Sequence, residues 1–110
     1  MPLYLCKGSY TSEGIKGLLK DGGTARRDAV VKATEAVGGK VLAFYYALGE
    51  TDLYGIFEAP GNIDVVAMSL GVNALGTARA EYVVLLTPEE MDQSVAMANK
   101  MMGAYRPPGA

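Results

Sequence analysis

The sequence contains no histidine and no tryptophan, and its only cysteine is Cys6. Histidine is the side chain best suited to act as a general base near neutral pH, and it is the most common protein ligand of metals. A single cysteine cannot form a disulfide within the chain. These absences exclude histidine-dependent catalysis, imidazole-ligated zinc, iron or haem, and an internal disulfide framework. We therefore expect no metal site and no cofactor.

The chain also has no large excess of charge of either sign. The chain has 10 basic and 12 acidic residues, a net charge of -2 and a pI near 5.0. Proteins that bind nucleic acids need a basic surface, and the pair Arg26-Arg27 is too small to supply one. No apolar run is long enough to span a bilayer, and the first residues lack a signal-peptide pattern. We expect no nucleic-acid partner, no membrane segment and a cytoplasmic location.

The residues that are present favour one compact domain, because 50% of the 110 positions are hydrophobic. Alternating side chains predict strands over 2–10, 40–48, 52–60 and 77–86. Apolar residues at helical spacing predict helices over 11–20, 25–37, 62–75 and 88–103. The candidate N-caps of these helices are Thr11, Thr24, Asn62 and Thr87.

This order of elements is the split βαβ pattern of ferredoxin-like α+β folds, an antiparallel βαββαβ sheet, here with an extra C-terminal helix. Right-handed crossovers place both main helices on one face of the sheet. The other face then stays bare, and a second copy of the chain is the simplest cover for it. We therefore expect a homodimer or a higher oligomer.

Two helices have apolar stripes whose contacts can be predicted. The helix over 62–75 is expected to turn five apolar residues toward the sheet, namely Ile63, Val66, Ala67, Leu70 and Ala74. The last helix carries Met91, Val95, Ala98 and Met102, with Met97 and Met101 nearby. Methionine is flexible and fills irregular contacts, so we expect this helix to form an oligomer contact or adaptable core.

The segment 44–60 holds most of the aromatic residues and reads as a β-hairpin that turns at Gly49-Glu50-Thr51-Asp52. Side chains alternate between the faces of a strand. The face expected under the helices carries Leu42, Phe44, Tyr46, Leu48, Leu53, Gly55 and Phe57. The opposite face mixes apolar residues, tyrosines and carboxylates, and it carries Val41, Ala43, Tyr45, Ala47, Asp52, Tyr54, Ile56 and Glu58.

Six polar residues are candidates for a pocket or for a subunit interface: Tyr45, Asp52, Tyr54, Glu58, Arg79 and Glu81. Arg79 and Glu81 share a strand face, where they would bind a carboxylate and move a proton, or form a structural ion pair. Tyr45 and Tyr54 would orient a substrate oxygen, or bury their rings at an interface.

Asp52 also has two interpretations, and three residues outside the six have weaker signals. Asp52 is a general base if its neighbours bury it, or a turn residue that accepts hydrogen bonds from the backbone. Lys7 and Tyr10 lie near the end of the first strand and are weaker candidates for the same cavity. Cys6 has no histidine to activate it, so a small buried apolar role is favoured over a nucleophile.

Five segments in this order resemble the GYD domain family, a branch of the dimeric α/β barrel group. They are Tyr10 to Ile15, Ala25 to Ala29, Ala43 to Asp52, Phe57 to Pro60 and Leu75 to Glu81. The resemblance covers about residues 1 to 90. The motif that names the family, Gly-x-Tyr-Asp, is Gly49-Glu50-Thr51-Asp52 in this chain, so Thr51 stands in the place of the tyrosine.

The resemblance implies a homodimer whose two sheets face each other, and it implies no particular activity. On this basis residues 1–90 form a ferredoxin-like, GYD-type domain. Residues 91–110 add a C-terminal helix and a short proline-rich tail to the same domain.

Three classes of function stay open. The first is a small-molecule binding protein with a pocket on the mixed polar sheet face. The second is a cofactor-independent enzyme, similar to a monooxygenase or an isomerase, that acts on a small oxygenated or aromatic compound. The third is a structural oligomerisation module in which the dimer interface covers the whole sheet face.

Overall fold

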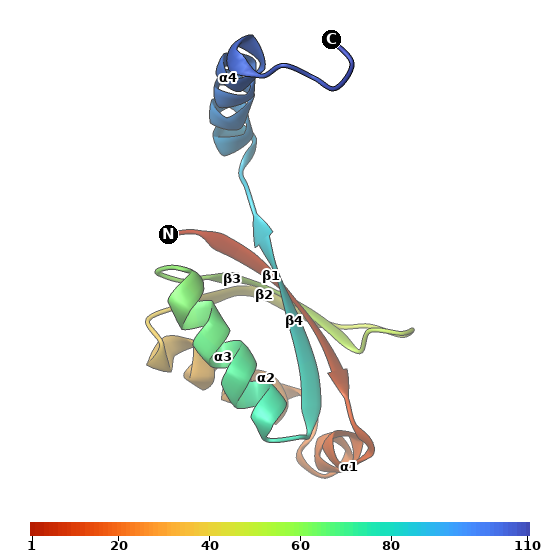
Figure 1. Cartoon of the computed structure of the whole chain (residues 1–110). Helices are drawn as coiled ribbons and strands as arrows, with labels where there is room; N and C mark the ends of the chain where they lie inside the picture. Colours follow the sequence, from red (N-terminus) through yellow and green to blue (C-terminus); the bar gives the residue numbers. More distant parts are fainter.

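The structure is a computed structural model that describes residues 1–110. Its strands are β1 (Leu3–Tyr10), β2 (Lys40–Tyr46), β3 (Leu53–Glu58) and β4 (Ala78–Leu85). Its helices are α1 (Ser12–Asp21), α2 (Gly23–Ala36), α3 (Asn62–Ala74) and α4 (Pro88–Ala104). The four strands form one antiparallel sheet in the order β2-β3-β1-β4. This is the predicted ferredoxin-like α+β architecture with an additional C-terminal helix (Figure 1).

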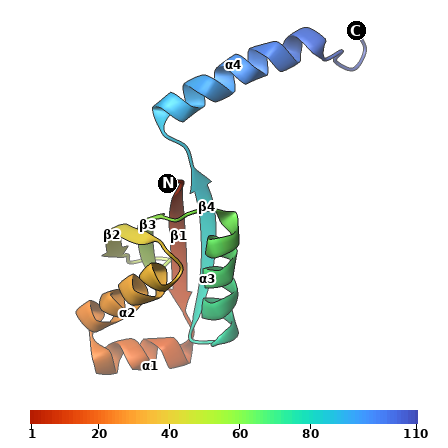
Figure 2. The same cartoon turned by 90° about the vertical axis from the view of Figure 1, so that its left-hand side faces the viewer.

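Helices α2 and α3 cover one face of the sheet, and the other face carries no helix (Figures 1 and 2). The core lies between these layers. It joins Cys6 and Phe57 of the sheet to Met68 of α3, and Tyr4 to Val65 of α3. Every second residue of β1 therefore points to the helices, and the residues between them lie on the bare face.

Two of the four predicted N-caps are confirmed. The Thr11 hydroxyl accepts a hydrogen bond from the backbone N–H of Gly14, and Thr87 forms a reciprocal capping box with Glu90. The other two are wrong, because α2 is capped by Gly22 and α3 by Gly61. Asn62 instead accepts a hydrogen bond from the Tyr4 hydroxyl at 2.7 Å, which ties α3 to β1.

The hairpin differs from its prediction at the start of β2. Val41 lies opposite Phe57 and Ala43 lies opposite Ile56, so a β-bulge occurs at Leu42. The bulge reverses the expected faces of two residues, because Val41 packs on the helix-side core while Leu42 is exposed. Leu48 was also expected under the helices. It lies in the loop after Tyr46 and is fully exposed.

Helix α3 turns a different stripe toward the sheet from the one predicted. Val65 and Met68 are buried, whereas Ile63, Val66 and Leu70 are exposed. Apolar residues occur on nearly all sides of this helix, so its periodicity does not identify the buried side. The inward side is set by the fit of Met68 against Cys6 and Phe57.

Helix α4 projects beyond the end of β4 and lies over neither face of the sheet (Figures 1 and 2). Every residue from Pro88 to Ala104 is exposed. The chain extends over 60 × 30 × 24 Å with a radius of gyration of 17.9 Å, whereas a compact domain of this length has about 13 Å. None of the helices combines the length and apolar content that a membrane crossing requires.

Candidate functional site

Polar side chains from four strands form one row across the bare face. In the register of the sheet, Tyr45 lies opposite Tyr54, Tyr54 opposite Lys7, and Lys7 opposite Glu81. Ser9 and Arg79 also lie opposite each other, two residues after Lys7 on β1 and two residues before Glu81 on β4. The antiparallel register therefore brings together residues that are far apart in the sequence.

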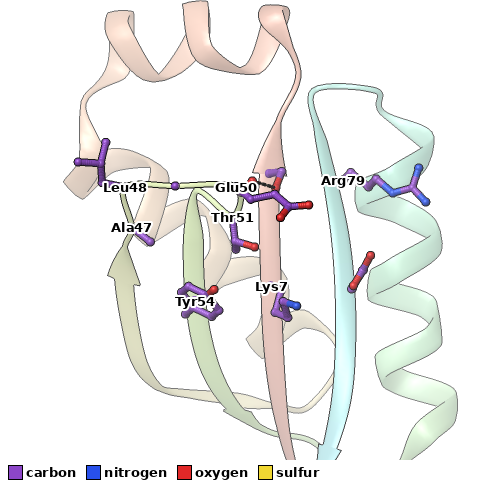
Figure 3. Close-up of a pocket in the computed structure, with 10 residues that line it drawn as sticks. Lys7, Ala47, Leu48, Glu50, Thr51, Tyr54 and Arg79 are labelled. Atoms are coloured by element: carbon purple, nitrogen blue, oxygen red, sulfur yellow. Dashed lines mark hydrogen bonds between the residues drawn. The ribbon is translucent and has the colours of Figure 1, made fainter.

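A hollow of about 580 Å³ lies over this end of the bare face. Its walls come from β1, β3 and β4 and from the loop between β2 and β3 (Figure 3). The lining residues are Lys7, Ser9, Ala47, Leu48, Gly49, Glu50, Thr51, Tyr54, Arg79 and Glu81. The loop contributes Thr51, and the Ser9 hydroxyl donates a hydrogen bond to the carbonyl oxygen of Glu50 at 3.2 Å.

The charged groups of the hollow have no ion-pair partners. The ion pairs of the chain are Lys16–Glu13, Arg26–Asp21 and Arg27–Asp28, and all three lie in or beside α1 and α2. In Figure 3 the Arg79 side chain extends toward the β4 edge of the sheet, away from Lys7. Arg79 and Glu81 therefore form no cross-strand ion pair within the chain, whereas the alternative of an ion pair between subunits stays a prediction. Two cations remain available to an anionic group.

The other end of the bare face is apolar. Leu5 lies opposite Ile56 and Val83, and Leu3 lies opposite Leu85. Ile56 is 37% exposed and Val83 is 44% exposed, because no helix covers this face of the sheet. The bare face thus has an apolar half at the beginning of β1 and a polar half at the end of β1.

The predicted site residues separate into four groups, of which three lie on the bare face. Tyr54, Arg79, Glu81 and the weaker candidate Lys7 line the hollow. Tyr45 continues their row but is 72% exposed and does not line the hollow. Glu58 lies opposite Leu3, at the apolar end of the face.

Asp52 and Tyr10 lie outside the hollow and contact each other. The Asp52 carboxylate accepts a hydrogen bond from the backbone N–H of Tyr10 at 2.8 Å, and the Asp52 N–H donates to the carbonyl oxygen of Gly8 at 2.9 Å. These bonds fasten the β2–β3 loop to β1, which is the structural role considered for Asp52. The Tyr10 side chain lies on the helix side of the sheet, so it cannot reach the hollow from there.

A second, smaller cavity lies between the sheet and the helices, and the sequence patterns did not indicate it. It measures about 110 Å³ and is mostly apolar, with Cys6, Tyr10, Arg26 and Tyr82 as its polar or ionisable lining residues beside Thr77. Gly8 lines this cavity, and a Cβ atom there would come within 3.0 Å of Leu53, so the Leu53 side chain fills the space over it. The alternation of Tyr4, Cys6, Gly8 and Tyr10 places two small residues between two tyrosines on this face of β1.

Burial keeps the groups around this cavity protonated. It raises the pKa of the Cys6 thiol to about 11, although the nearby Tyr82 hydroxyl acts in the opposite direction. Burial, together with Cys6, also raises the pKa of Tyr82. Outside the cavity lining, partial desolvation and the neighbouring Tyr10 raise the pKa of Tyr46 to about 12. A neutral thiol is a poor nucleophile, so the cavity presents weak hydrogen-bonding groups in an apolar lining.

Comparison with known proteins gives one informative result. No curated protein and no solved structure matches the chain significantly. The model of the GYD domain family matches residues 4–95, which include the sheet except Leu3, helices α1 to α3 and about the first half of α4. Because this match spans most of the 110 residues, the chain belongs to the GYD domain family.

Proposed function

We propose that this protein is a small-molecule binding homodimer and that its ligand occupies the polar hollow on the bare sheet face. The observation that carries this proposal is the presence of Lys7 and Arg79 at an open hollow without carboxylate partners. Cations that have no partner within the protein bind carboxylates through charge-assisted hydrogen bonds.

The lining indicates a ligand with two kinds of polar group. A carboxylate would contact Lys7 or Arg79, and a hydroxyl would donate a hydrogen bond to Glu81 or Glu50. The ring of Tyr54 offers a flat apolar surface beside them. A small hydroxylated aromatic acid combines these features, so 4-hydroxybenzoate is a suitable probe.

The apolar half of the same face favours a second copy of the chain. Ile56 and Val83 are exposed and flank the half-buried Leu5, and the contact of this apolar patch with water is unfavourable. A two-fold axis would set this patch against its copy, as in the isologous interfaces of most homodimers. The polar hollow would then be bounded on one side by the partner, which would shield the ligand from solvent.

Calorimetric titration with 4-hydroxybenzoate tests the binding proposal. Lys7→Met and Arg79→Gln each remove one charged contact, which contributes about 1.5–3 kcal/mol, so the affinity should fall about tenfold or more. Lys32→Met, which removes an exposed cation on α2, should bind like the wild type. The neutral analogue 4-hydroxybenzyl alcohol should bind all four proteins equally weakly. Equal affinity of all four proteins for the acid would contradict the proposal.

The alternative of a cofactor-independent enzyme has one observation in its favour. The internal cavity brings Tyr10, Tyr82 and Arg26 to one apolar space, and phenol and guanidinium groups can stabilise a negatively charged oxygen during a reaction. In this alternative Tyr82→Phe abolishes turnover while Lys7→Met does not. The binding proposal instead predicts that Lys7→Met weakens ligand binding and that Tyr82→Phe does not. The two variants therefore distinguish the two functions.

A further inference from the structure

Helix α4 is a well-formed helix that has no extensive contact with any other helix or strand of the chain. All its residues are exposed, and it continues from β4 into solvent (Figure 2). Its start is defined by the capping box of Thr87 and Glu90 and by Pro88 in the first turn. Most of the stability of a helix in a protein comes from packing of its apolar face rather than from helix propensity, and this 17-residue helix buries none of its residues. A helix with such a strong start and no partner in its own chain indicates a partner from another chain.

The exposed apolar residues of α4 follow the repeat of a coiled coil. Met91, Val95, Ala98 and Met102 are separated by four, three and four residues, and this spacing keeps them on one side of the helix. Met91, Val95 and Met102 are each at least half exposed. We name these four residues the α4 stripe. Its length, about three helical turns, suits a short two-helix contact.

The charges of α4 are divided between its two ends. Glu89, Glu90 and Asp92 lie in the first turns, whereas Lys100 lies near the end and Arg106 follows it. In a parallel pair, the three acidic residues of one helix would lie beside those of the other. In an antiparallel pair, the acidic beginning of each helix meets the basic end of its partner, and the helix dipoles are also opposed favourably.

We propose that α4 pairs with the α4 helix of a second copy of this chain, antiparallel and along the α4 stripe. In the register that centres the pair, Met91 packs against the partner's Met102, and Val95 packs against the partner's Ala98. The small side chain of Ala98 lets the helix axes approach where Val95 projects. Met101 flanks the stripe and adapts to its edge.

This contact is separate from the sheet interface of the proposed function. Helix α4 lies beyond the end of β4, whereas the apolar patch of the bare face lies on the sheet itself (Figures 1 and 2). Two different self-complementary surfaces on one chain build assemblies larger than a dimer. A pair of short helices is weak alone, but a second interface raises its effective concentration. We therefore expect a dimer of dimers.

Cross-linking tests the orientation of the pair in the full-length protein. Met91→Cys and Met102→Cys are prepared separately, mixed in the reduced state until subunits exchange, and oxidised. Antiparallel pairing predicts a covalent dimer that joins one variant to the other, with little product from either variant alone. Cys6 is buried and its thiol stays protonated, so it contributes little background. Ala96→Cys, on the opposite side of α4, measures random collisions.

Two results would overturn the proposal. A covalent dimer formed by Met91→Cys alone would indicate parallel pairing. Cross-linking of the mixture at the level of Ala96→Cys would show that α4 does not pair with α4, for example because it docks on the exposed side of α3. Either result would leave the expected difference in ligand affinity between the wild type and Lys7→Met unchanged. Failure of the helix pairing can therefore be distinguished from failure of the proposed function.

Mass measurement by light scattering provides the second readout. Val95→Glu/Met102→Glu places two charges on the stripe and should halve the mass of the assembly. Gln93→Glu/Ala96→Glu adds the same charge on the opposite side of α4 and should leave the mass unchanged. Equal masses for both double variants would contradict pairing along the stripe.

Discussion

Lys7 lies directly opposite Glu81 across the β1–β4 pair, yet the two side chains form no ion pair. Both therefore remain available to a ligand in the hollow, and neither contributes much to the stability of the single chain. We predict that Glu81→Gln changes the free energy of unfolding by less than about 0.5 kcal/mol. Chemical denaturation measures this. A loss above about 2 kcal/mol, or dissociation of the dimer, would instead identify Glu81 as a structural ion-pair residue, and the binding site would have to be reconsidered.

The apolar half of the bare face provides a test of the dimer. Val83→Glu places a charge in the patch that a partner sheet would bury, which costs several kcal/mol when the charge has no partner. We predict that this variant is smaller than the wild type by light scattering. Val66→Glu is the matched control, because Val66 is similarly exposed but lies on α3, outside the bare face of the sheet. A reduced mass for both variants, or for neither, would exclude the sheet patch as the specific interface.

Substitution by alanine at two glycines of α1 is expected to have opposite effects on the stability of the protein. A Cβ atom at Gly14 would overlap the carbonyl oxygen of Thr77, whereas a Cβ atom at Gly17 would meet nothing. Gly14→Ala should therefore destabilise the protein by about 1–3 kcal/mol. Gly17→Ala should stabilise it by about 0.5–1 kcal/mol, because alanine favours the helix. Thermal unfolding of the two variants checks both signs, and stabilisation by Gly14→Ala would contradict the packing of α1 against Thr77.

The Asp52 carboxylate should matter for stability and little for ligand binding. Asp52→Ala leaves the Tyr10 N–H without its acceptor, so we expect a loss of about 1–3 kcal/mol. Asp52→Asn retains an oxygen acceptor and should lose less. Urea denaturation combined with 4-hydroxybenzoate titration separates the two roles. Unchanged stability with abolished binding would show that Asp52 acts on the ligand.

The buried thiol predicts a loss of stability at alkaline pH. Cys6 ionises at its ordinary pKa of 9.0 in the unfolded chain, but burial raises the pKa to about 11 in the folded chain. Protonation therefore favours the folded state, and this contribution is lost as the pH rises from 9 toward 11. The serine hydroxyl of Cys6→Ser does not titrate in this range. We predict a flatter decline of the unfolding midpoint for Cys6→Ser, and parallel profiles would contradict the assignment.

The order of helices and strands was predictable because its signals are local. Thr87, Pro88 and Glu90 define the start of α4 through bonds within one turn. Alternation in β4 likewise placed Arg79 and Glu81 on one face, and Lys7 was a weaker candidate for the same cavity. These patterns depend on residues that are close in the sequence, so they can be predicted without information on distant contacts.

Features that depend on distant contacts were not predictable. The bulge at Leu42 exists because Val41 pairs with Phe57 on the helix side, and simple alternation does not reveal an extra residue. The buried side of α3 depends on the fit of Met68 to Cys6 and Phe57. The hollow itself needs the loop residues Glu50 and Thr51 to lie over β1, which only the folded hairpin brings about.

Native mass spectrometry of the full-length protein tests the central claim most directly, because it reports subunit number and bound ligand together. We predict an even-numbered assembly of 11.6 kDa subunits that retains 4-hydroxybenzoate. In Lys7→Met the same assembly should persist with the ligand lost. A monomer without ligand, or retention of the ligand by Lys7→Met at the wild-type level, would contradict a binding homodimer that uses the bare sheet face.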